Sequence, residues 1–519
     1  MRVFSTMLLL LFAATTFSQE WPLKKLVQDK KASKIAFTVI PAFSFVRNKT
    51  VGNKGTYQEL RLNPAFSKQL LQQKPEAIQI SIPLSSTKSI TCDLLKFTLG
   101  EIIFTENDKD IIENIKVPVT YRGIITGQYS KNNVMLTVNE DYVSLTATAD
   151  DRILQITKAN ENISNNYRLY NSTQIDNPQP LPSCGTGNRA SSITANGIDL
   201  SGATNPLGSI DKCVYVFVDC FDSLYIWKDT STQKTINYVY ELFNAVSTGY
   251  LNEQVNILIT AINIWSTAGP YRHDNRENSL ADLSLKWKDS FWGNICVGLD
   301  YVGGRSGLAG GIGTSKGVSV NTCPVYKYSG TDSISACCYN DLNYGGKYDS
   351  FPTGPNTTQS QIYLVMHEMG HLLGSAHTQW CGWVISTGTP IVLGALDNCA
   401  PPEPAFVNTT CPPGPPPPGG KGTIMSYCNI GGPLVSFNRG FGVQPGNAVR
   451  NYIDKNSCFP SCLVCTGLRY NHSADNRHTF AWLPRASTSQ KSTTKVLPAA
   501  EDAAQPSNNQ NEILSNFKQ

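Results

Sequence analysis

The chain has 519 residues, of which 40% are hydrophobic and 16% are charged, and its formal net charge is +4. This length is sufficient for two hydrophobic cores with additional tails. The small positive charge is not gathered into a basic run of the kind that binds nucleic acid, so we expect no nucleic-acid partner. Fifteen cysteines indicate an oxidising compartment in which disulfide bonds form.

The first 18 residues have the pattern of a secretory signal peptide. Arg2 precedes the apolar run Met7–Phe12, and small residues follow as far as Ser18. Neither this run nor any later segment reaches the roughly 18 apolar residues that a membrane span requires. We therefore predict a secreted, extracellular monomer without a membrane anchor, and we assign residues 1–18 to the signal peptide. Six glycosylation sequons are typical of such a protein, and they lie at Asn48, Asn162, Asn171, Asn356, Asn408 and Asn471.

Residues 19–200 are predicted to form a β-rich region. Short alternating runs of apolar and polar residues, for example residues 77–82 and 134–138, are separated by turn-forming Asn, Asp, Lys and Gly. We find no constellation of His, Cys and acidic residues within these runs. The chemistry of the side chains therefore does not indicate what this region does.

A helix is predicted to follow Thr358. Thr358 and Gln361 have the spacing of a capping box. Apolar residues then recur at the helical period, at Ile362, Val365, Met366, Met369, Leu372 and Leu373. This helix carries the sequence His-Glu-Met-Gly-His over residues 367–371.

Three histidines and one glutamate of this segment have the spacing of a catalytic zinc site. His367 and His371 are four residues apart, so both can face a single ion. Gly374 is expected to end the helix in a left-handed conformation, which lets the chain return His377 as a third ligand. Three protein ligands leave one position open, as in catalytic zinc sites. Glu368 can then act as a general base.

The alternative is an amphipathic helix whose histidines are solvated or satisfied within the core. Two observations argue against it. Five residues of fixed type occur in this register, and three of the chain's six histidines lie in one motif. Cys458, Cys462 and Cys465 raise the alternative of a second zinc site. The surrounding sequence has no further ligands at structural-zinc spacing, so disulfides are favoured there.

The longer pattern H-E-x-x-H-x-x-G-x-x-H, together with residues 422–428 around Met425, resembles metzincin metallopeptidases of the adamalysin/reprolysin-like type, particularly the secreted reprolysin-like branch. The resemblance implies an α/β metzincin catalytic domain, a mixed sheet plus helices, over residues 201–460. It also implies that Met425 supports the floor beneath the zinc without binding it. Thr378 stands where adamalysins commonly carry aspartate.

The resemblance implies a secreted zinc-dependent endopeptidase that hydrolyses peptide bonds by a zinc-activated water, with Glu368 as general base and protein or peptide substrates. One catalytic zinc is expected, and calcium is left open. One alternative is a secreted, catalytically inactive adhesion or binding protein on the same fold, which has no chemical need for Glu368. Another is a gluzincin-type peptidase with a carboxylate as third ligand. His377 argues against it, as does the Met-turn, the name used for residues 422–428 around Met425.

The β-rich region of residues 19–200 resembles the pro-region of this family, and residues 121–127 look like a strand of it; a stable accessory domain is the alternative. Cys184 lies where the pro-region would join the enzyme. It is a candidate cysteine switch that occupies the open zinc position and makes the protein a latent zymogen. The alternative is that Cys184 is an ordinary disulfide partner.

The segment between His377 and the Met-turn contains three cysteines and the proline-rich residues 411–420, which predicts a stiff loop tied by disulfides. Such a loop would border the cleft. Residues 461–519 are assigned to a short cysteine-containing stretch and a disordered tail, because few large apolar residues occur from Asn471 onward.

Overall fold

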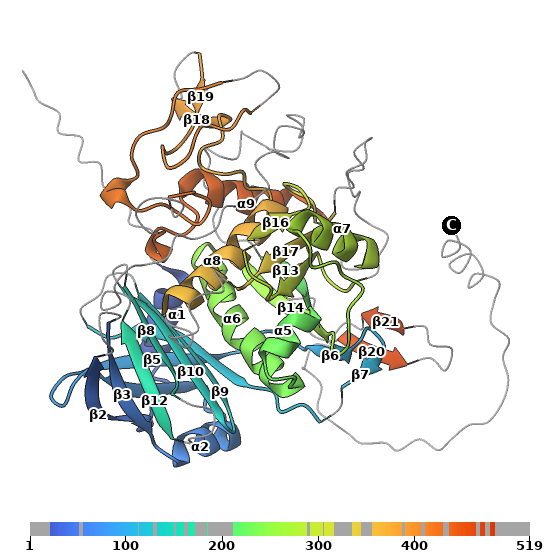
Figure 1. The fold of residues 1–519 in the computed structure, drawn as a ribbon. Coiled ribbons are helices and arrows are strands. Elements are labelled where there is room, and N and C mark those ends of the chain that lie inside the picture. The colour runs from blue at the N-terminus through green and yellow to red at the C-terminus, as the bar shows by residue number, and fades with distance from the viewer. Residues whose placement is uncertain are drawn as a thin grey trace, which may run out of the picture. The chain divides into compact units, whose positions relative to one another are not determined.

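The protein was analysed as a computed structural model (Figure 1). It describes residues 21–50, 55–112, 114–127, 132–149, 152–159, 165–171, 184, 211–287, 291–304, 306–315, 335–343, 355–386, 390–405, 410–428, 435–462, 468–472 and 478–482. The predicted signal peptide and the sequons at Asn162 and Asn408 lie outside the described residues. Among the residues that are described, no helix is both long and apolar enough to cross a membrane.

The chain divides into two compact units, residues 1–465 and residues 466–519. In the second unit, the described residues form one antiparallel hairpin of β20 (Leu468–His472) and β21 (His478–Trp482). The prediction of disorder from Asn471 onward was therefore wrong for these strands. Tyr, Thr, Phe and Trp in both segments favour extended structure, and the composition of the longer tail concealed this local preference.

A ten-stranded sheet forms the N-terminal part of the first unit, with the order β1-β4-β5-β8-β9-β10-β11-β12-β3-β2. This confirms a β-rich N-terminal region. The strands are β1 (Thr38–Val39), β2 (Phe43–Thr50), β3 (Thr56–Leu62), β4 (Ala77–Pro83), β5 (Ser89–Phe97), β8 (Val119–Ile125), β9 (Asn132–Asn139), β10 (Tyr142–Ala149), β11 (Arg152–Lys158) and β12 (Asn166–Asn171), and the helices beside them are α1 (Pro22–Ala32) and α2 (Ala65–Gln73).

The alternation of side chains between the two faces of these strands explains the hydrophobic core of the N-terminal sheet. In the β9/β10 pair, Leu136 lies opposite Leu145, and Val138 lies opposite Val143. All four side chains are buried in one cluster, which also contains Phe66 of α2. Successive side chains of a strand point to opposite faces of the sheet, so each apolar face that these strands present is buried by its neighbours and by α2.

A second sheet has the order β16-β17-β15-β13-β14-β6-β7 and forms the rest of the unit together with helices (Figure 1). Its neighbours are parallel from β6 through β14, β13 and β15 to β17, whereas β16 is antiparallel. The strands are β6 (Ile103–Glu106), β7 (Asp110–Ile111), β13 (Cys213–Cys220), β14 (Asn256–Ile264), β15 (Ile295–Asp300), β16 (Gly307–Ala309) and β17 (Cys337–Asp341).

The remaining elements are α5 (Asp222–Trp227), α6 (Thr232–Asn252), α7 (Arg276–Trp287), α8 (Pro355–Leu372), α9 (Val443–Lys455), the short hairpin β18 (Trp383–Ser386) and β19 (Val392–Gly394), and the 3-10 turns η2 (Pro418–Gly420) and η3 (Phe437–Arg439). The mixed sheet with helices is thereby confirmed.

The predicted start of the histidine-bearing helix was wrong. Helix α8 begins at Pro355, so the backbone of Thr358 is already helical and Thr358 is not its N-cap. Proline fits the first helical turn, where its missing N–H has no intrahelical acceptor. The capping-box spacing was therefore coincidental.

The two sheets are joined because β6 and β7 come from the N-terminal region and extend the second sheet. Strand β6 pairs with β14 in parallel. Just before β6, Ile259 N–H donates to Leu99 O at 2.6 Å, and Leu99 belongs to the main core of the second sheet. Residues 103–111, inside the predicted pro-region, are thus integral to the sheet that also contains β13.

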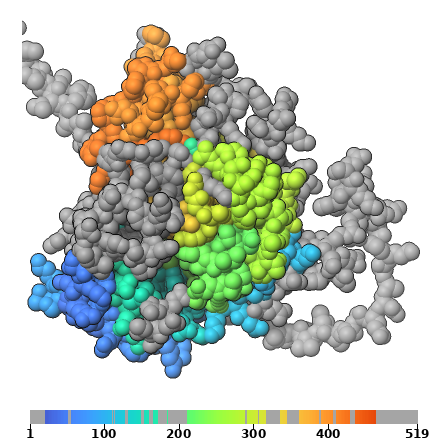
Figure 2. All heavy atoms as spheres, viewed as in Figure 1, coloured from blue at the N-terminus to red at the C-terminus, as the bar shows by residue number. Residues whose placement is uncertain are grey.

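A largely polar contact links the N-terminal sheet to α6. Arg122 of β8 is buried and donates from Nε to Asn244 Oδ1 at 2.8 Å and from Nη2 to Ser247 Oγ. Burial lowers the pKa of Arg122 to about 9. Asn244 in turn donates to Leu136 O of β9 at 3.2 Å. In the space-filling view, the teal residues of the N-terminal sheet border the green residues that include α6 (Figure 2).

Gly100 allows the close approach of the N-terminal chain to β14, and its substitution tests this junction. It has φ +132°, and a Cβ there would collide with the carbonyl oxygen of Ile259. We predict that Gly100→Ala disrupts the β6/β14 pairing and accelerates hydrogen exchange of the β14 amides. Gly127, with φ +101° and open space around it, is the matched control. Alanine at either position adds about 1–3 kcal/mol of backbone strain, but Gly127→Ala causes no collision. Unchanged protection of β14 in Gly100→Ala would contradict the role of the junction.

Candidate active site

Helix α8 is packed so closely that its histidines are removed from solvent. It lies against α6 and against strands β16 and β17 (Figure 1). A Cβ at Gly249 of α6 would collide with Met366 of α8, and Tyr250 O–H donates to Met366 O at 2.9 Å. One turn of α8 is thereby fixed, and the side chains of His367 and His371 that follow are at most 1% exposed.

The structure brings His367, His371 and His377 together. The Nε2 atoms of His371 and His367 are 3.2 Å apart, and those of His371 and His377 are 3.0 Å apart. The Nε2 atoms of His377 and His367 are 3.1 Å apart. Three nitrogens that each bind a tetrahedral zinc ion at 2.0–2.1 Å would be separated by about 3.3 Å. The three histidines therefore match the spacing that a single zinc ion requires.

The other ring nitrogen of each histidine has an oxygen acceptor. His367 Nδ1 lies 2.6 Å from Ile424 O, and His371 Nδ1 lies 2.7 Å from Ser375 O. His377 Nδ1 lies 2.9 Å from both carboxylate oxygens of Glu403. Because oxygen acceptors place the ring proton on Nδ1, the Nε2 lone pairs face one another.

Burial favours neutral imidazoles at this cluster. Burial together with the neighbouring His377 lowers the pKa of His367 to about 3. Burial also holds the pKa of His371 well below its usual range, and both other histidines add to the effect. Neutral imidazole is the form that ligates a metal. His367 and His371 therefore fit zinc in protonation as well as in spacing.

The left-handed turn predicted at Gly374 is confirmed. Gly374 has φ +98°, and a Cβ there would lie 2.8 Å from Cβ of Tyr452. Its N–H donates to His371 O at 2.9 Å, and the N–H of Ser375 donates to Gly370 O at 2.9 Å. These bonds cap the C-terminus of α8 and turn the chain so that His377 meets the two helical histidines.

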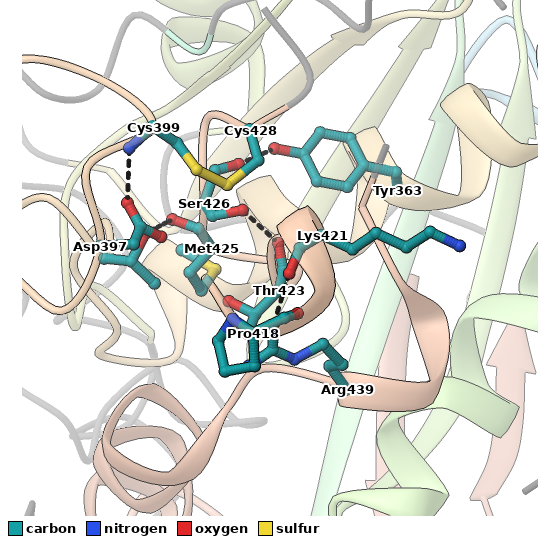
Figure 3. Close-up of a disulfide and its surroundings, with 11 residues drawn as sticks. Tyr363, Asp397, Cys399, Pro418, Lys421, Thr423, Met425, Ser426, Cys428 and Arg439 are labelled. Carbon is teal, nitrogen blue, oxygen red and sulfur yellow. Dashed lines mark hydrogen bonds between the residues drawn. A yellow bond between two sulfur atoms is a disulfide. The ribbon is translucent and has the colours of Figure 1, made fainter. Parts of the chain in front are cut away.

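Met425 is buried in a turn that contacts α8 and lies near the Cys399–Cys428 disulfide (Figure 3). A Cβ at Gly370 would lie 2.8 Å from Met425 Sδ, so the glycine of the helix gives the methionine its space. Tyr363 O–H donates to Ser426 O at 2.8 Å, and Thr378 N–H donates to Met425 O at 3.0 Å. The turn is therefore bonded both to the helix and to the segment that carries His377.

Glu368 is fully buried beside the histidine cluster. Its carboxylate lies against Gly307 of the edge strand β16, where a Cβ would collide with Oε1. No sequence motif singles out Gly307. A side chain at this position would displace the carboxylate, so the small residue on β16 helps define where the base lies.

Cys184 joins the same cluster. Its Sγ lies 3.3 Å from Glu368 Oε2 and 3.5 Å from His371 Nε2, and with the three histidines it forms a group of donor atoms that all lie within 4.8 Å of one another. Cys184 carries a thiol rather than a disulfide, and Cys213 is bonded to Cys462. The disulfide alternative for Cys184 is not what the structure shows.

Two further residues of the site were not identified from the sequence. Tyr427 donates its hydroxyl hydrogen to Cys184 O, and its ring centroid lies 4.4 Å from that of His377. Glu403 contacts the same histidine from a loop 26 residues further along the chain. Tyr427 follows Met425 by two positions, which was an available local signal, but Glu403 has no motif spacing that would have revealed it.

The loop between His377 and the Met-turn is tied by disulfides, as predicted. Cys381 pairs with Cys411, and Cys399 pairs with Cys428 (Figure 3). Cys458 and Cys462 are also disulfide-bonded, which agrees with the preference for disulfides over a second zinc site. The Cys399–Cys428 bond joins the loop to the turn that contains Met425.

Comparison with known proteins agrees with this geometry. Residues 212–437 match the family model Reprolysin_5, described as metallo-peptidase family M12. A crystal structure of metalloproteinase-II from Bacteroides fragilis is 11% identical, with 60% of this chain and 85% of that chain covered and a TM-score of 0.35, a similarity too low to carry an argument. The matched segment extends from the start of β13 to η3 and includes α8, His377 and Met425. The similarity of residues 212–437 to M12 metallopeptidases supports a zinc metalloprotease.

Proposed function

We propose that the chain is a secreted zinc endopeptidase of the reprolysin-like metzincin type, produced as a latent zymogen. The observation that carries the proposal is the convergence of three buried histidine Nε2 atoms within 3.2 Å, with the Glu368 carboxylate beside them. The disulfides of the loop and of the C-terminal segment suit an oxidising extracellular environment.

His367, His371 and His377 would hold the zinc. When bound, the ion would supply Lewis acidity, which lowers the pKa of a water molecule and polarises a substrate carbonyl. Glu368 would accept the proton from that water and deliver it to the leaving amine. The Nδ1 hydrogen bonds keep the three rings oriented, and Met425 packs below them without serving as a ligand.

The role of Glu368 can be separated from metal binding. The carboxylate is not needed as a ligand, so Glu368→Ala should retain zinc and the fold. Peptidase activity of the activated enzyme should fall by roughly 10² to 10⁴, the loss typical of a missing acid–base group. Zinc content and circular dichroism serve as controls for Glu368→Ala and Glu368→Gln. Wild-type activity in either zinc-loaded variant would exclude Glu368 as the base.

Latency is supported by the position of Cys184. Its thiol lies within 3.5 Å of both Glu368 and His371, so it fills the space in which the base would meet water and substrate. The thiol donates to the Glu368 carboxylate, which occupies the proton acceptor. Sulfur is also a zinc ligand, so Cys184 would serve as a fourth donor when the ion is present.

Tyr427 would hold the inhibitory residue in place. Its hydroxyl binds the carbonyl oxygen of Cys184, while its ring packs on His377. One hydrogen bond contributes about 0.5–1.5 kcal/mol, so the tyrosine would strengthen latency without being its sole basis. The thiol and the backbone carbonyl of the same residue are thus both fixed within the site.

The switch makes a testable prediction. In the purified full-length precursor, Cys184→Ala should be active or self-processing, and an organomercurial should activate the wild type before any cleavage because it captures the thiol. Activity is measured on a quenched peptide library, and cleavage is followed by mass spectrometry.

The contrasting variants distinguish two modes of inhibition. Tyr427→Phe retains the ring and removes the hydroxyl, so it should respond to lower organomercurial concentrations than the wild type. If Cys184→Ala stays latent, the N-terminal region inhibits by filling the cleft, and the thiol is not the switch. Cys92→Ala, which removes a buried thiol of the N-terminal sheet, should leave latency unchanged and serves as the control.

A further inference from the structure

The third histidine differs from the other two in the partner of its Nδ1 atom. His367 and His371 each face a neutral backbone carbonyl. His377 faces a carboxylate, because both oxygens of Glu403 lie 2.9 Å from its Nδ1. A charged acceptor holds an imidazole N–H more strongly than a neutral one does.

The backbone holds Glu403 rigidly. Its N–H donates to Gln379 O at 2.9 Å, and its carbonyl accepts from Cys381 N–H at 2.8 Å. Proline follows it directly, which restricts its backbone to extended conformations. Glu403 thereby forms an isolated parallel β-bridge with Trp380, three residues beyond His377, and its side chain reaches the histidine.

The surroundings support the same placement. Gln379 Nε2 donates to Glu403 Oε1 at 2.9 Å, and the Glu403 side chain is 18% exposed. The Cys381–Cys411 and Cys399–Cys428 bonds close the loop on both sides of residue 403. The carboxylate is therefore oriented by hydrogen bonds and a crosslinked loop before any ion binds.

From these contacts we infer that Glu403 is a positioning residue for His377, fixing its ring with the proton on Nδ1 and the Nε2 lone pair toward the ion. The inference rests on the proposed zinc function. Carboxylates that accept from metal-binding histidines fix the tautomer and raise the basicity of the ligating nitrogen, and their loss typically weakens metal binding by about 10- to 100-fold. Glu403 touches no reacting atom in this arrangement.

The consequence is specific to one of the three ligands. Without Glu403, the His377 ring can rotate or place its proton on Nε2, and either change removes a lone pair from the cluster. The backbone acceptors of His367 and His371 are unaffected. The site would then have two fixed ligands and one loosely held ligand, which alters the ligand field as well as the affinity.

The test compares Glu403→Ala, Glu403→Gln and Gln379→Ala in the full-length chain. Zinc affinity is measured by competition with a chromophoric chelator, and the visible absorption bands of the cobalt-substituted protein report the ligand field. Glu403→Ala should bind zinc about 10- to 100-fold more weakly and shift the cobalt bands. Glu403→Gln retains an oxygen acceptor and should lie between Glu403→Ala and the wild type. Gln379→Ala removes one of the hydrogen bonds that orient the carboxylate, so it should change zinc affinity and the cobalt bands in the same direction as Glu403→Ala but by less.

The possible results separate the two claims. Wild-type affinity and cobalt bands in Glu403→Ala would overturn the positioning role. If Glu403→Ala fails to form the two loop disulfides, which mass spectrometry detects, Glu403→Gln decides the matter: wild-type affinity and bands in that variant overturn the role, and partial loss supports it. A wild-type chain that binds no zinc would instead contradict the proposed function itself.

Discussion

The structure depends on three imidazoles whose Nε2 lone pairs face one another within 3.2 Å. Three lone pairs at this distance repel one another, and a shared cation converts the repulsion into ligation. The arrangement must therefore be held by its surroundings before the ion binds. The acceptors on Nδ1, the left-handed turn at Gly374, the bonded Met-turn and the crosslinked loop each fix one part of it.

Features set by local spacing could be predicted from the sequence. The three histidines, Gly374 and the strands β4 and β9 follow from helical and extended periodicity, which act over a few residues. Glu403, Gly307 and strand β6 could not be predicted, because their roles arise from contacts between distant segments. The capping box at Thr358 failed because a short local pattern recurs by chance, and α8 begins at Pro355 instead.

The N-terminal region contributes to the molecule in three physically different ways. Strand β6 extends the second sheet, Arg122 forms a buried polar contact with α6, and Cys184 reaches the histidine cluster. Strand pairing and buried hydrogen bonds hold this region on the structure, and Cys184 contacts Glu368 and His371 of the site. Under the proposed zymogen mechanism, activation requires only the displacement of Cys184, and the remaining contacts need not break.

The central claim is that the three histidines bind one zinc ion on which peptide hydrolysis depends. The most direct measurement strips the activated protein with 1,10-phenanthroline and then titrates zinc back while metal content and peptidase activity are recorded together. Peptidase activity should disappear on stripping and return in proportion to the added zinc, up to one ion per chain. His377→Ala should neither bind zinc nor recover activity. Full activity in the metal-free protein, or recovery in His377→Ala equal to that of the wild type, would contradict it.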